Sequence, residues 1–450
     1  MAIPCAITRK TGALPARPVY VAHKINGRTF VKTLLASTAL LTCALAAALP
    51  TMADDDVDAH SGNPVTLAVY GDAPYGCKAP TAAAAPDECP VGSPYVPDSP
   101  NGPNPGDPRQ VQATPAFIEA VNGDAKVRLV LHVGDIHSGS GYCTLAYDQT
   151  IFDLWTQFKN PLVYTPGDNE WTDCQKSKEG GGVKNSAGEY VDYAAGHPVA
   201  NLALVRSMFF REAGATLGDH KKHVISQAQA YDPAHPSDAE YIENVMWEQS
   251  QVLFVTLNIP GGSNNDDDLW NTGAFGTVKS APQLQEVAQR TAADLRWLDA
   301  AFAQAKADGA KAVVIAEQAD MWDLDGTGPS LSHIANYEPF IAKIKTLTQD
   351  FKNPVLLING DSHKYRSDNP LQDNAPCVIE TGVGTNTALC ADDDYDTHPY
   401  YPDGVSNFHR LVVHGSTFPL QYTRLTVNPR ASNPTTATSF GPFSWERVIP

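Results

Sequence analysis

Four Gly-Asp pairs, each directly after an apolar run, are the residues of this sequence best suited to chemistry. Their aspartates are Asp72, Asp135, Asp168 and Asp361. A glycine lets the chain turn sharply and frees the next side chain to point away from the strand. Because ligands bind beyond the carboxyl ends of strands in α/β sheets, we expect the four carboxylates to converge. Like charges gather only around a cation, so the pattern predicts a divalent metal site, with two ions expected.

The elements that must position these pairs alternate between strand and helix. Apolar, β-branched runs predict strands at residues 65–70, 127–133, 161–164, 252–257, 312–315 and 355–358. Helices are predicted at residues 115–121, 145–158, 283–307 and 339–351. The alternation predicts an α/β fold, while the C-terminal part of the chain is predicted to be mostly strands and turns.

The order and relative spacing of the pairs resemble those of the calcineurin-like metallophosphoesterases. That family has Asp-x-His, Gly-Asp, Gly-Asn-His-Asp/Glu, a lone His after a strand, and Gly-His-x-His, in this order. The resemblance extends from Asp72 to His363. It implies a four-layer α/β sandwich, with two central mixed sheets flanked by helices. It also implies two metal ions bridged by Asp135, and hydrolysis of phosphoric esters.

Carried over position by position, the resemblance implies a set of site residues. The implied metal ligands are Asp72, Asp135, Asp168, Asn169, Gln318, Asp361 and His363, and the implied catalytic residues are His137 and Asn169. Asp168 takes the position of the Asn ligand and Asn169 that of the catalytic His. A shift of one residue would instead make Asn169 the ligand, and the sequence leaves both possibilities open.

Several family histidines are replaced. Pro74, Gln318 and Asp361 stand at such positions, and of these Gln318 and Asp361 carry side-chain oxygens. A donor set of mostly carboxylate and amide oxygens favours Mn²⁺, Mg²⁺ or Ca²⁺ over Zn²⁺. Ser138 stands where the purple acid phosphatase branch has a tyrosine, so we expect no colour from an iron–tyrosinate pair.

In the implied mechanism, a metal-bound hydroxide attacks phosphorus and the leaving group needs a proton. Asn169 can hydrogen-bond a phosphoryl oxygen but cannot deliver a proton, so we expect His137 to act as the acid or as a ligand. His132 is expected to be a buried core histidine. Residues 258–265 follow a strand and are candidates to line the substrate side. The alternative is a catalytically inactive binding protein on the same fold.

The N-terminal 53 residues differ from the rest of the chain. They contain six basic and no acidic residues, then an apolar run at 34–49 and small residues at 51 and 53. This pattern predicts a signal peptide at 1–53 and a secreted or periplasmic protein; a retained membrane anchor is the alternative. The remainder divides into a metallophosphoesterase-like domain at 54–427, with loop insertions at 77–108 and 175–200, and a C-terminal extension at 428–450.

The cysteines indicate the kind of cellular compartment, and the net charge indicates the class of partner. We expect disulfides Cys77–Cys89, Cys143–Cys174 and Cys377–Cys390, although the sequence alone does not choose among the possible pairings. The formal net charge of the 450 residues is −18, which argues against nucleic acid as a partner. We therefore expect a small phosphorylated substrate and no stable membrane insertion, while the oligomeric state is not indicated.

Overall fold

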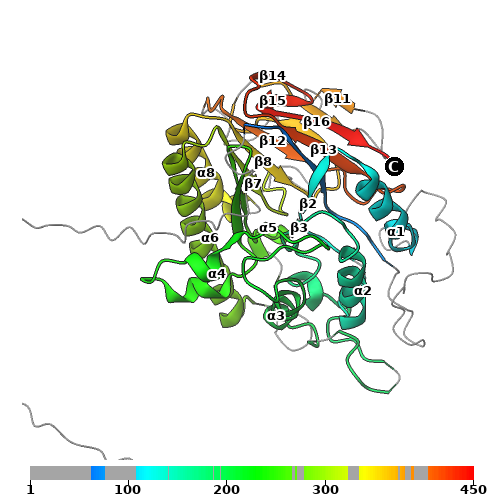
Figure 1. Cartoon of the computed structure of the whole chain (residues 1–450). Helices are drawn as coiled ribbons and strands as arrows, with labels where there is room; N and C mark the ends of the chain where they lie inside the picture. The colour runs from blue at the N-terminus through cyan, green and yellow to red at the C-terminus, as the bar shows by residue number, and fades with distance from the viewer. Residues whose placement is uncertain are drawn as a thin grey trace, which may run out of the picture. The chain divides into compact units, whose positions relative to one another are not determined.

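The computed structural model describes residues 62–76, 108–139, 141–185, 187–192, 194–265, 269–270, 278–322, 334–372, 375–380, 387–389 and 404–450. The predicted signal peptide, the predicted Cys77–Cys89 disulfide and most of the predicted insertion at 77–108 lie outside these residues. The described part of the chain is built from two mixed β-sheets and the helices that cover them (Figure 1).

The first sheet contains seven strands within the described residues, in the order β14-β15-β16-β13-β1-β2-β3. Their bounds are β1 Val65–Tyr70, β2 Val127–His132, β3 Leu162–Tyr164, β13 Tyr422–Val427, β14 Asn433–Thr436, β15 Ser439–Gly441 and β16 Phe443–Val448. Strands β1, β2 and β3 are parallel, and β13 is antiparallel to β1. Helices α1 (Pro108–Gly123), α2 (Leu145–Trp155) and α3 (Pro198–Phe209) pack on this sheet.

The second sheet has the order β11-β10-β9-β12-β8-β7-β6-β5-β4. Its strands are β4 Ile225–Ser226, β5 Val245–Gln249, β6 Val252–Thr256, β7 Ala312–Ala316, β8 Val355–Asn359, β9 Arg366–Asp368, β10 Val378–Glu380, β11 Thr387–Leu389 and β12 Phe408–Val412. Strands β6, β7, β8 and β12 run parallel. The long helices α6 (Ala281–Asp308) and α8 (Glu338–Phe351) cover its outer face.

Both faces of each sheet are buried, which explains why the central strands are continuous apolar runs. In β1, Val65, Leu67 and Val69 face the second sheet, whereas Ala68 and Tyr70 face the helices. Figure 1 shows α6 and α8 on one side of the paired sheets and α1 and α2 on the other. This order of helices, sheet, sheet and helices confirms the predicted four-layer α/β sandwich.

The segment 428–450 contributes β14, β15 and β16 to the first sheet, although the sequence analysis set it apart as an extension. Strand β16 pairs with β13 over six residues, from Tyr422↔Val448 to Val427↔Phe443. Phe443 and Trp445 are buried between the sheets. The segment is therefore an integral part of the fold, because its apolar side chains fill the core between the layers.

Short elements connect the strands and helices. They are α4 Gln227–Ala230, α5 Gly261–Asn265 and three 3₁₀ turns, η1 Asp173–Gln175, η2 Ser177–Glu179 and η3 Pro236–Glu240. The predicted Cys143–Cys174 disulfide is confirmed and joins the chain before α2 to η1. Cys377 is disulfide-bonded, and its predicted partner Cys390 lies outside the described residues.

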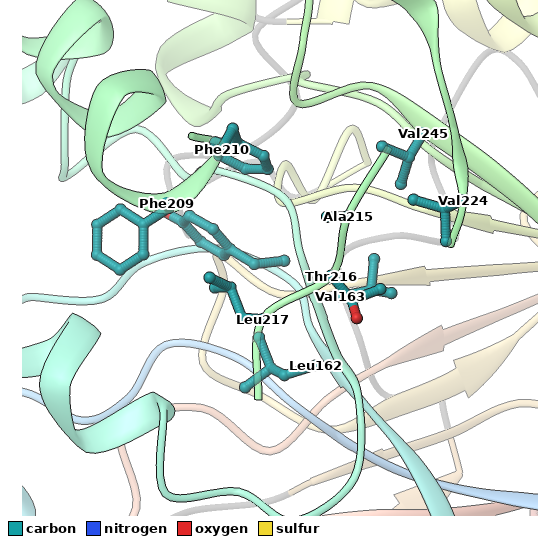
Figure 2. A pocket seen from close by; sticks show the side chains of 10 residues that line it. Leu162, Val163, Phe209, Phe210, Ala215, Thr216, Leu217, Val224 and Val245 are labelled. Carbon is teal, nitrogen blue, oxygen red and sulfur yellow. The ribbon is translucent and has the colours of Figure 1, made fainter. Parts of the chain in front are cut away.

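A small cavity and the hydropathy of the helices are two further features of the fold. An apolar cavity of about 20 Å³ lies beside β3 and is lined mainly by residues 162–164, 209–210 and 215–217 (Figure 2). It includes none of the Gly-Asp pairs. Within the residues described, no helix combines the length and the apolar character that crossing a bilayer requires.

Candidate metal centre

The four aspartates of the Gly-Asp pairs converge at the carboxyl ends of β1, β2, β3 and β8. Ligand atoms of Asp72, Asp135 and His363 lie within 4.8 Å of one another, and we call these residues the first ligand group. Carboxylate oxygens of Asp135, Asp168 and Asp361 also lie within 4.8 Å of one another and form the second ligand group. Asp135 belongs to both groups, so the two sheets bring together what the sequence places almost 300 residues apart.

The backbone approaches this centre closely through its glycines. A Cβ atom on Gly360 or Gly415 would lie 2.6 Å from Asp72 Oδ2. A Cβ on Gly261 would lie 2.5 Å from Asp168 Oδ2, and one on Gly167 would overlap Asp135 Oδ1. Gly167 and Gly360, which precede two of the aspartates, are thus required not only for the turn but also because a neighbouring carboxylate fills the space of a side chain.

Several of the site residues themselves have left-handed backbone conformations. The φ angles are 50° for Asp72, 60° for Asp135, 74° for Asp361 and 61° for His363. Such angles are strained for residues other than glycine, and they persist where the surroundings hold them. Here the strain turns successive carboxylates toward one point.

Backbone N–H groups from other loops hold the carboxylates of Asp72 and Asp361. The Asp361 N–H donates to Asp72 Oδ1 at 2.8 Å, which links the loops after β8 and β1. The Asp320 N–H donates to Asp361 Oδ2 at 3.0 Å. Asp320 is in turn paired with the fully buried Arg410, which also binds Asp368. These contacts fix the carboxylates from outside the ligand groups.

The centre concentrates negative charge in a buried place. Burial, with the charges of Asp168 and Glu170, raises the pKa of Asp72 to about 8, against the opposing Asp361 N–H. Burial and the same neighbouring charges raise the pKa of Asp135 well above its usual range. Asp72 Oδ2 is buried and has no hydrogen-bond partner among the described residues. A divalent cation in the first ligand group would neutralise the concentrated negative charge and relieve the burial of Asp72 and Asp135 as carboxylates, so these residues fit the implied metal.

Gln318 lies at the second ligand group, but with its amide nitrogen toward the carboxylates. Its Oε1 accepts the Gly261 N–H at 2.6 Å. Its Nε2 lies 3.3 Å from Asp135 Oδ2, 3.1 Å from Asp168 Oδ1 and 3.1 Å from Asp361 Oδ1. Gln318 is therefore a hydrogen-bond donor to the carboxylates here, and not the oxygen ligand that the motif comparison implied.

Asp168 and Asn169 take distinct places, where the sequence left two assignments open. The carboxylate of Asp168 belongs to the second ligand group. Asn169 donates to Asp135 twice, from its backbone N–H at 3.3 Å and from Nδ2 at 3.0 Å. Glu170 accepts the Tyr164 hydroxyl and the Gly167 N–H, and so braces the turn itself.

His137, which was predicted to act as the acid or as a ligand, packs against α2. It is buried, its Nδ1 lies 3.4 Å from the Ser138 carbonyl oxygen, and its ring meets Tyr147 edge-on. A ring nitrogen comes near the sulfurs of Cys143 and Cys174, but a disulfide cannot ligate a metal as thiolate does. Burial lowers the pKa of His137 to about 4, so at neutral pH its ring is neutral and is not the imidazolium that would act as the acid.

His132 is buried in the core, as expected, and it joins the first two loops. The Gly134 N–H donates to His132 Nδ1 at 3.2 Å, so the ring proton is on Nε2. Nε2 then donates to the Ala73 carbonyl oxygen at 2.7 Å. One imidazole thereby fixes the distance between the turns that carry Asp72 and Asp135.

Tyr75 is a site residue that sequence reasoning missed. Its hydroxyl lies 2.9 Å from His363 Nε2, and its side chain is fully buried. Burial and the charges of Asp135 and Asp72 raise its pKa well above the usual value, so it remains a protonated hydrogen-bond donor. Its place three residues after Asp72, in the same loop, was the available signal.

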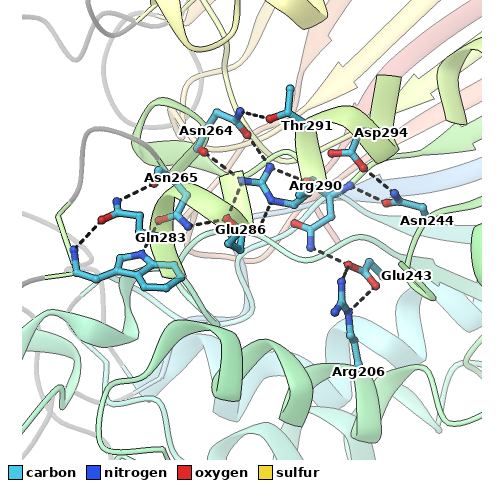
Figure 3. A network of polar contacts seen from close by, with 12 residues as sticks. Arg206, Glu243, Asn244, Asn264, Asn265, Gln283, Glu286, Arg290, Thr291 and Asp294 are labelled. Carbon is cyan, nitrogen blue, oxygen red and sulfur yellow. Dashed lines mark hydrogen bonds and ion pairs between the residues drawn. The ribbon is translucent and has the colours of Figure 1, made fainter. Parts of the chain in front are cut away.

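The candidate substrate-side segment 258–265 is instead occupied by internal contacts. Ser263, Asn264 and Asn265 are buried, with φ angles of 57°, 60° and 61°. Asn264 binds Arg290 and Thr291 of α6, while Asn265 binds Glu286 and Trp270 (Figure 3). This left-handed turn forms a wall of the centre through Gly261.

Comparisons with known proteins show a likeness to solved structures and none to a family model or a curated protein. No protein-family model matches the chain, and no curated protein matches its sequence. Among solved structures, the chain is similar to a purple acid phosphatase from yellow lupin (Lupinus luteus) seeds, at 14% identity and a TM-score of 0.34. The match covers 82% of this chain and 50% of that chain, so this chain spans about half its length. The fold is therefore assigned from the two sheets and their helices.

Proposed function

We propose that this protein is a metal-dependent hydrolase of phosphoric esters. The first ligand group carries the proposal, because it joins two aspartates and a histidine, and one of these aspartates, Asp72, has a buried oxygen, Oδ2, without a hydrogen-bond partner among the described residues. Strand-end carboxylates in the order of the metallophosphoesterase motifs support the same class of reaction. Hard divalent ions such as Mn²⁺, Mg²⁺ or Ca²⁺ suit this mostly oxygen donor set better than Zn²⁺.

Around such an ion, different residues of the chain would act as ligands, as hydrogen-bond donors and as supports of the loops. Asp72, Asp135 and His363 would hold the ion, which when bound supplies Lewis acidity and an activated water. Tyr75 and Asn169 offer hydrogen-bond donors at the edge of the ligand groups, where phosphoryl oxygens can be oriented. His132 and the glycines hold the loops in place.

We also propose that the protein is exported and acts on a small phosphorylated substrate. The basic, then apolar, N-terminal sequence has the form of a secretory signal. The Cys143–Cys174 disulfide suits an oxidising compartment. The acidic composition gives no support for nucleic acid as a substrate.

Metal reconstitution tests the proposal directly. The purified protein is stripped with chelator, supplied with Mn²⁺, Mg²⁺, Ca²⁺ or Zn²⁺, and assayed with a nitrophenyl phosphate monoester and diester. Activity should return with a hard ion. Asp135→Asn should lower it by at least about a hundredfold with unchanged circular dichroism, since one ligand of both groups is lost.

Asp299→Asn is the matched control, because Asp299 lies on α6 with a side chain 51% exposed and pairs only with a surface lysine among the contacts described. It should keep full activity. A folded protein that retains no metal would contradict the proposal and would favour the alternative, a binding protein on this fold.

A further inference from the structure

The amide of Gln318 occupies the place between three carboxylates where a second metal ion is expected. The side chain is fully buried, and its Nε2 lies 3.1 to 3.3 Å from one oxygen each of Asp135, Asp168 and Asp361. These are the same three residues that make up the second ligand group. Two amide hydrogens are thus shared among three carboxylate oxygens.

The orientation of this amide is set by a contact on its other side. The Gly261 N–H donates to Gln318 Oε1 at 2.6 Å. Turning the amide over would place its NH₂ against this N–H and leave a buried donor without an acceptor. The nitrogen, and not the oxygen, is therefore the atom held toward the carboxylates.

The chain on both sides of Gly261 is held by a buried arginine. Residues 262–265 continue from Gly261 in left-handed conformations, which are unfavourable for residues with side chains. Arg290 is fully buried and donates to Asn264 Oδ1 at 2.5 Å, to the Asn264 carbonyl at 3.1 Å and to the Asn258 carbonyl at 3.2 Å (Figure 3). The turn, and with it the direction of the Gly261 N–H, is fixed from α6.

The two ligand groups consequently differ in what they offer an ion. In the first group, Asp72 Oδ2 is buried without a partner in the described part of the chain. In the second group, the positive ends of the Gln318 N–H bonds point at the oxygens that would bind the ion, and they would repel it. An imidazole nitrogen or an amide oxygen at this position would coordinate the ion instead.

We propose that Gln318 substitutes for the second cation, so that the protein binds a single divalent ion, in the first ligand group. The amide holds Asp135, Asp168 and Asp361 together by hydrogen bonds, and Arg290 acts through the turn at 262–265 as the positioning residue for that amide. This inference rests on one part of the proposed function, namely that the first ligand group binds a metal ion.

The stoichiometry of bound Mn²⁺ tests the inference without any assay of activity. The metal-free protein is titrated with Mn²⁺, and bound metal is measured by equilibrium dialysis with elemental analysis and by electron paramagnetic resonance. The wild type should bind one Mn²⁺ per chain and give the six-line signal of an isolated ion. Gln318→His, which supplies a ligand nitrogen, should bind two and lose this signal through coupling of neighbouring ions.

Gln318→Leu is the matched control for the histidine variant. It removes the donors without adding a ligand, and it should not reach two tightly bound ions. Two ions per wild-type chain with similar affinity would overturn the inference and leave the proposed function standing. No bound ion in the folded wild type would overturn both.

Discussion

Asn169 contacts the shared aspartate through two donors, but an amide cannot give up a proton to a departing alkoxide. The nearest histidine along the loop, His137, is buried with a pKa lowered to about 4. Tyr75 stays protonated as a donor, since burial and nearby carboxylates raise its pKa. Once the carboxylates of the ligand groups are taken up by the ion and by Gln318, the described residues offer hydrogen bonds to a phosphoryl group, and neither His137 nor Tyr75 is poised to act as an acid near neutral pH.

This chemistry predicts a steep dependence on the leaving group. A general acid contributes about 10²- to 10⁴-fold for poor leaving groups, and little for nitrophenolate. The quantity to compare is the ratio of kcat/KM for a nitrophenyl phosphate to kcat/KM for an alkyl phosphate. We expect this ratio to be at least about a hundredfold larger in the wild type than in Asn169→His, which restores a possible acid. A series of aryl and alkyl phosphates measures the slope. A wild-type rate independent of leaving-group pKa would show that an acid is present after all.

At the residue scale, the sequence predicted which aspartates meet, but not the direction of each polar side chain. Asp72, Asp135, Asp168 and Asp361 were identified because a buried strand and a glycine precede each of them. The orientation of Gln318 depends on the N–H of Gly261, which lies 57 residues earlier in the chain. No local pattern contains that information.

The loops at the strand ends act as close-packed elements. Two of the Gly-Asp turns pack against the carboxylate of another turn, Gly167 against Asp135 and Gly360 against Asp72, and Gly261 packs against Asp168. Adding a side chain at a neighbouring glycine can therefore displace a carboxylate as effectively as replacing the aspartate itself. The glycines then matter for metal binding although they carry no ligand.

Gly167→Ala tests this close packing. Its Cβ would overlap Asp135 Oδ1, so we expect Mn²⁺ affinity to fall at least about tenfold, with a loss of about 1–3 kcal/mol in the free energy of unfolding from overpacking. Isothermal titration and urea unfolding measure the two effects. Gly123→Ala, at the exposed end of α1 with nothing within 4 Å of the new Cβ, is the control and should change neither. Equal metal affinity in both variants would refute the packing argument.

The elements were predicted better in their cores than at their ends. The helix predicted at 283–307 is α6, Ala281–Asp308, which begins at the capping Ser280 and ends at the left-handed Gly309. The helix predicted at 115–121 begins seven residues earlier, at Pro108, and contains Pro115 inside it. The C-terminal strands escaped assignment because β14 and β15 are short and half exposed, and their register depends on β16 and β13.

At the scale of the whole molecule, side chains from the two sheets meet in one core. His409 of β12 belongs to the second sheet, and its ring stacks on Phe440 and lies beside Trp445 of the first. It is fully buried, and its Nε2 lies 3.0 Å from the Ser367 hydroxyl. Burial between packed layers disfavours the charged form of an imidazole, so the stability of the sandwich should depend on the protonation of His409.

Burial and the neighbouring Arg410 lower the pKa of His409 to about 4, against the opposing charge of Asp368. Since an unfolded chain protonates histidine near its ordinary pKa of about 6.5, the contribution of a neutral His409 is fully present above that pH. It is lost as pH falls from about 6.5 toward 4. Between pH 7.5 and 5, the wild type should lose about 2 kcal/mol more unfolding free energy than His409→Gln.

Urea unfolding at the two pH values, without added metal, measures this difference. His220→Gln is the control, because His220 is exposed and its substitution should leave the pH dependence of stability as in the wild type. Comparing changes with pH, and not absolute stabilities, removes the cost of the substitution itself and the titration of the carboxylates at the metal centre, which both proteins share. Parallel losses in the wild type and His409→Gln would mean that the layers separate enough to admit a charged ring.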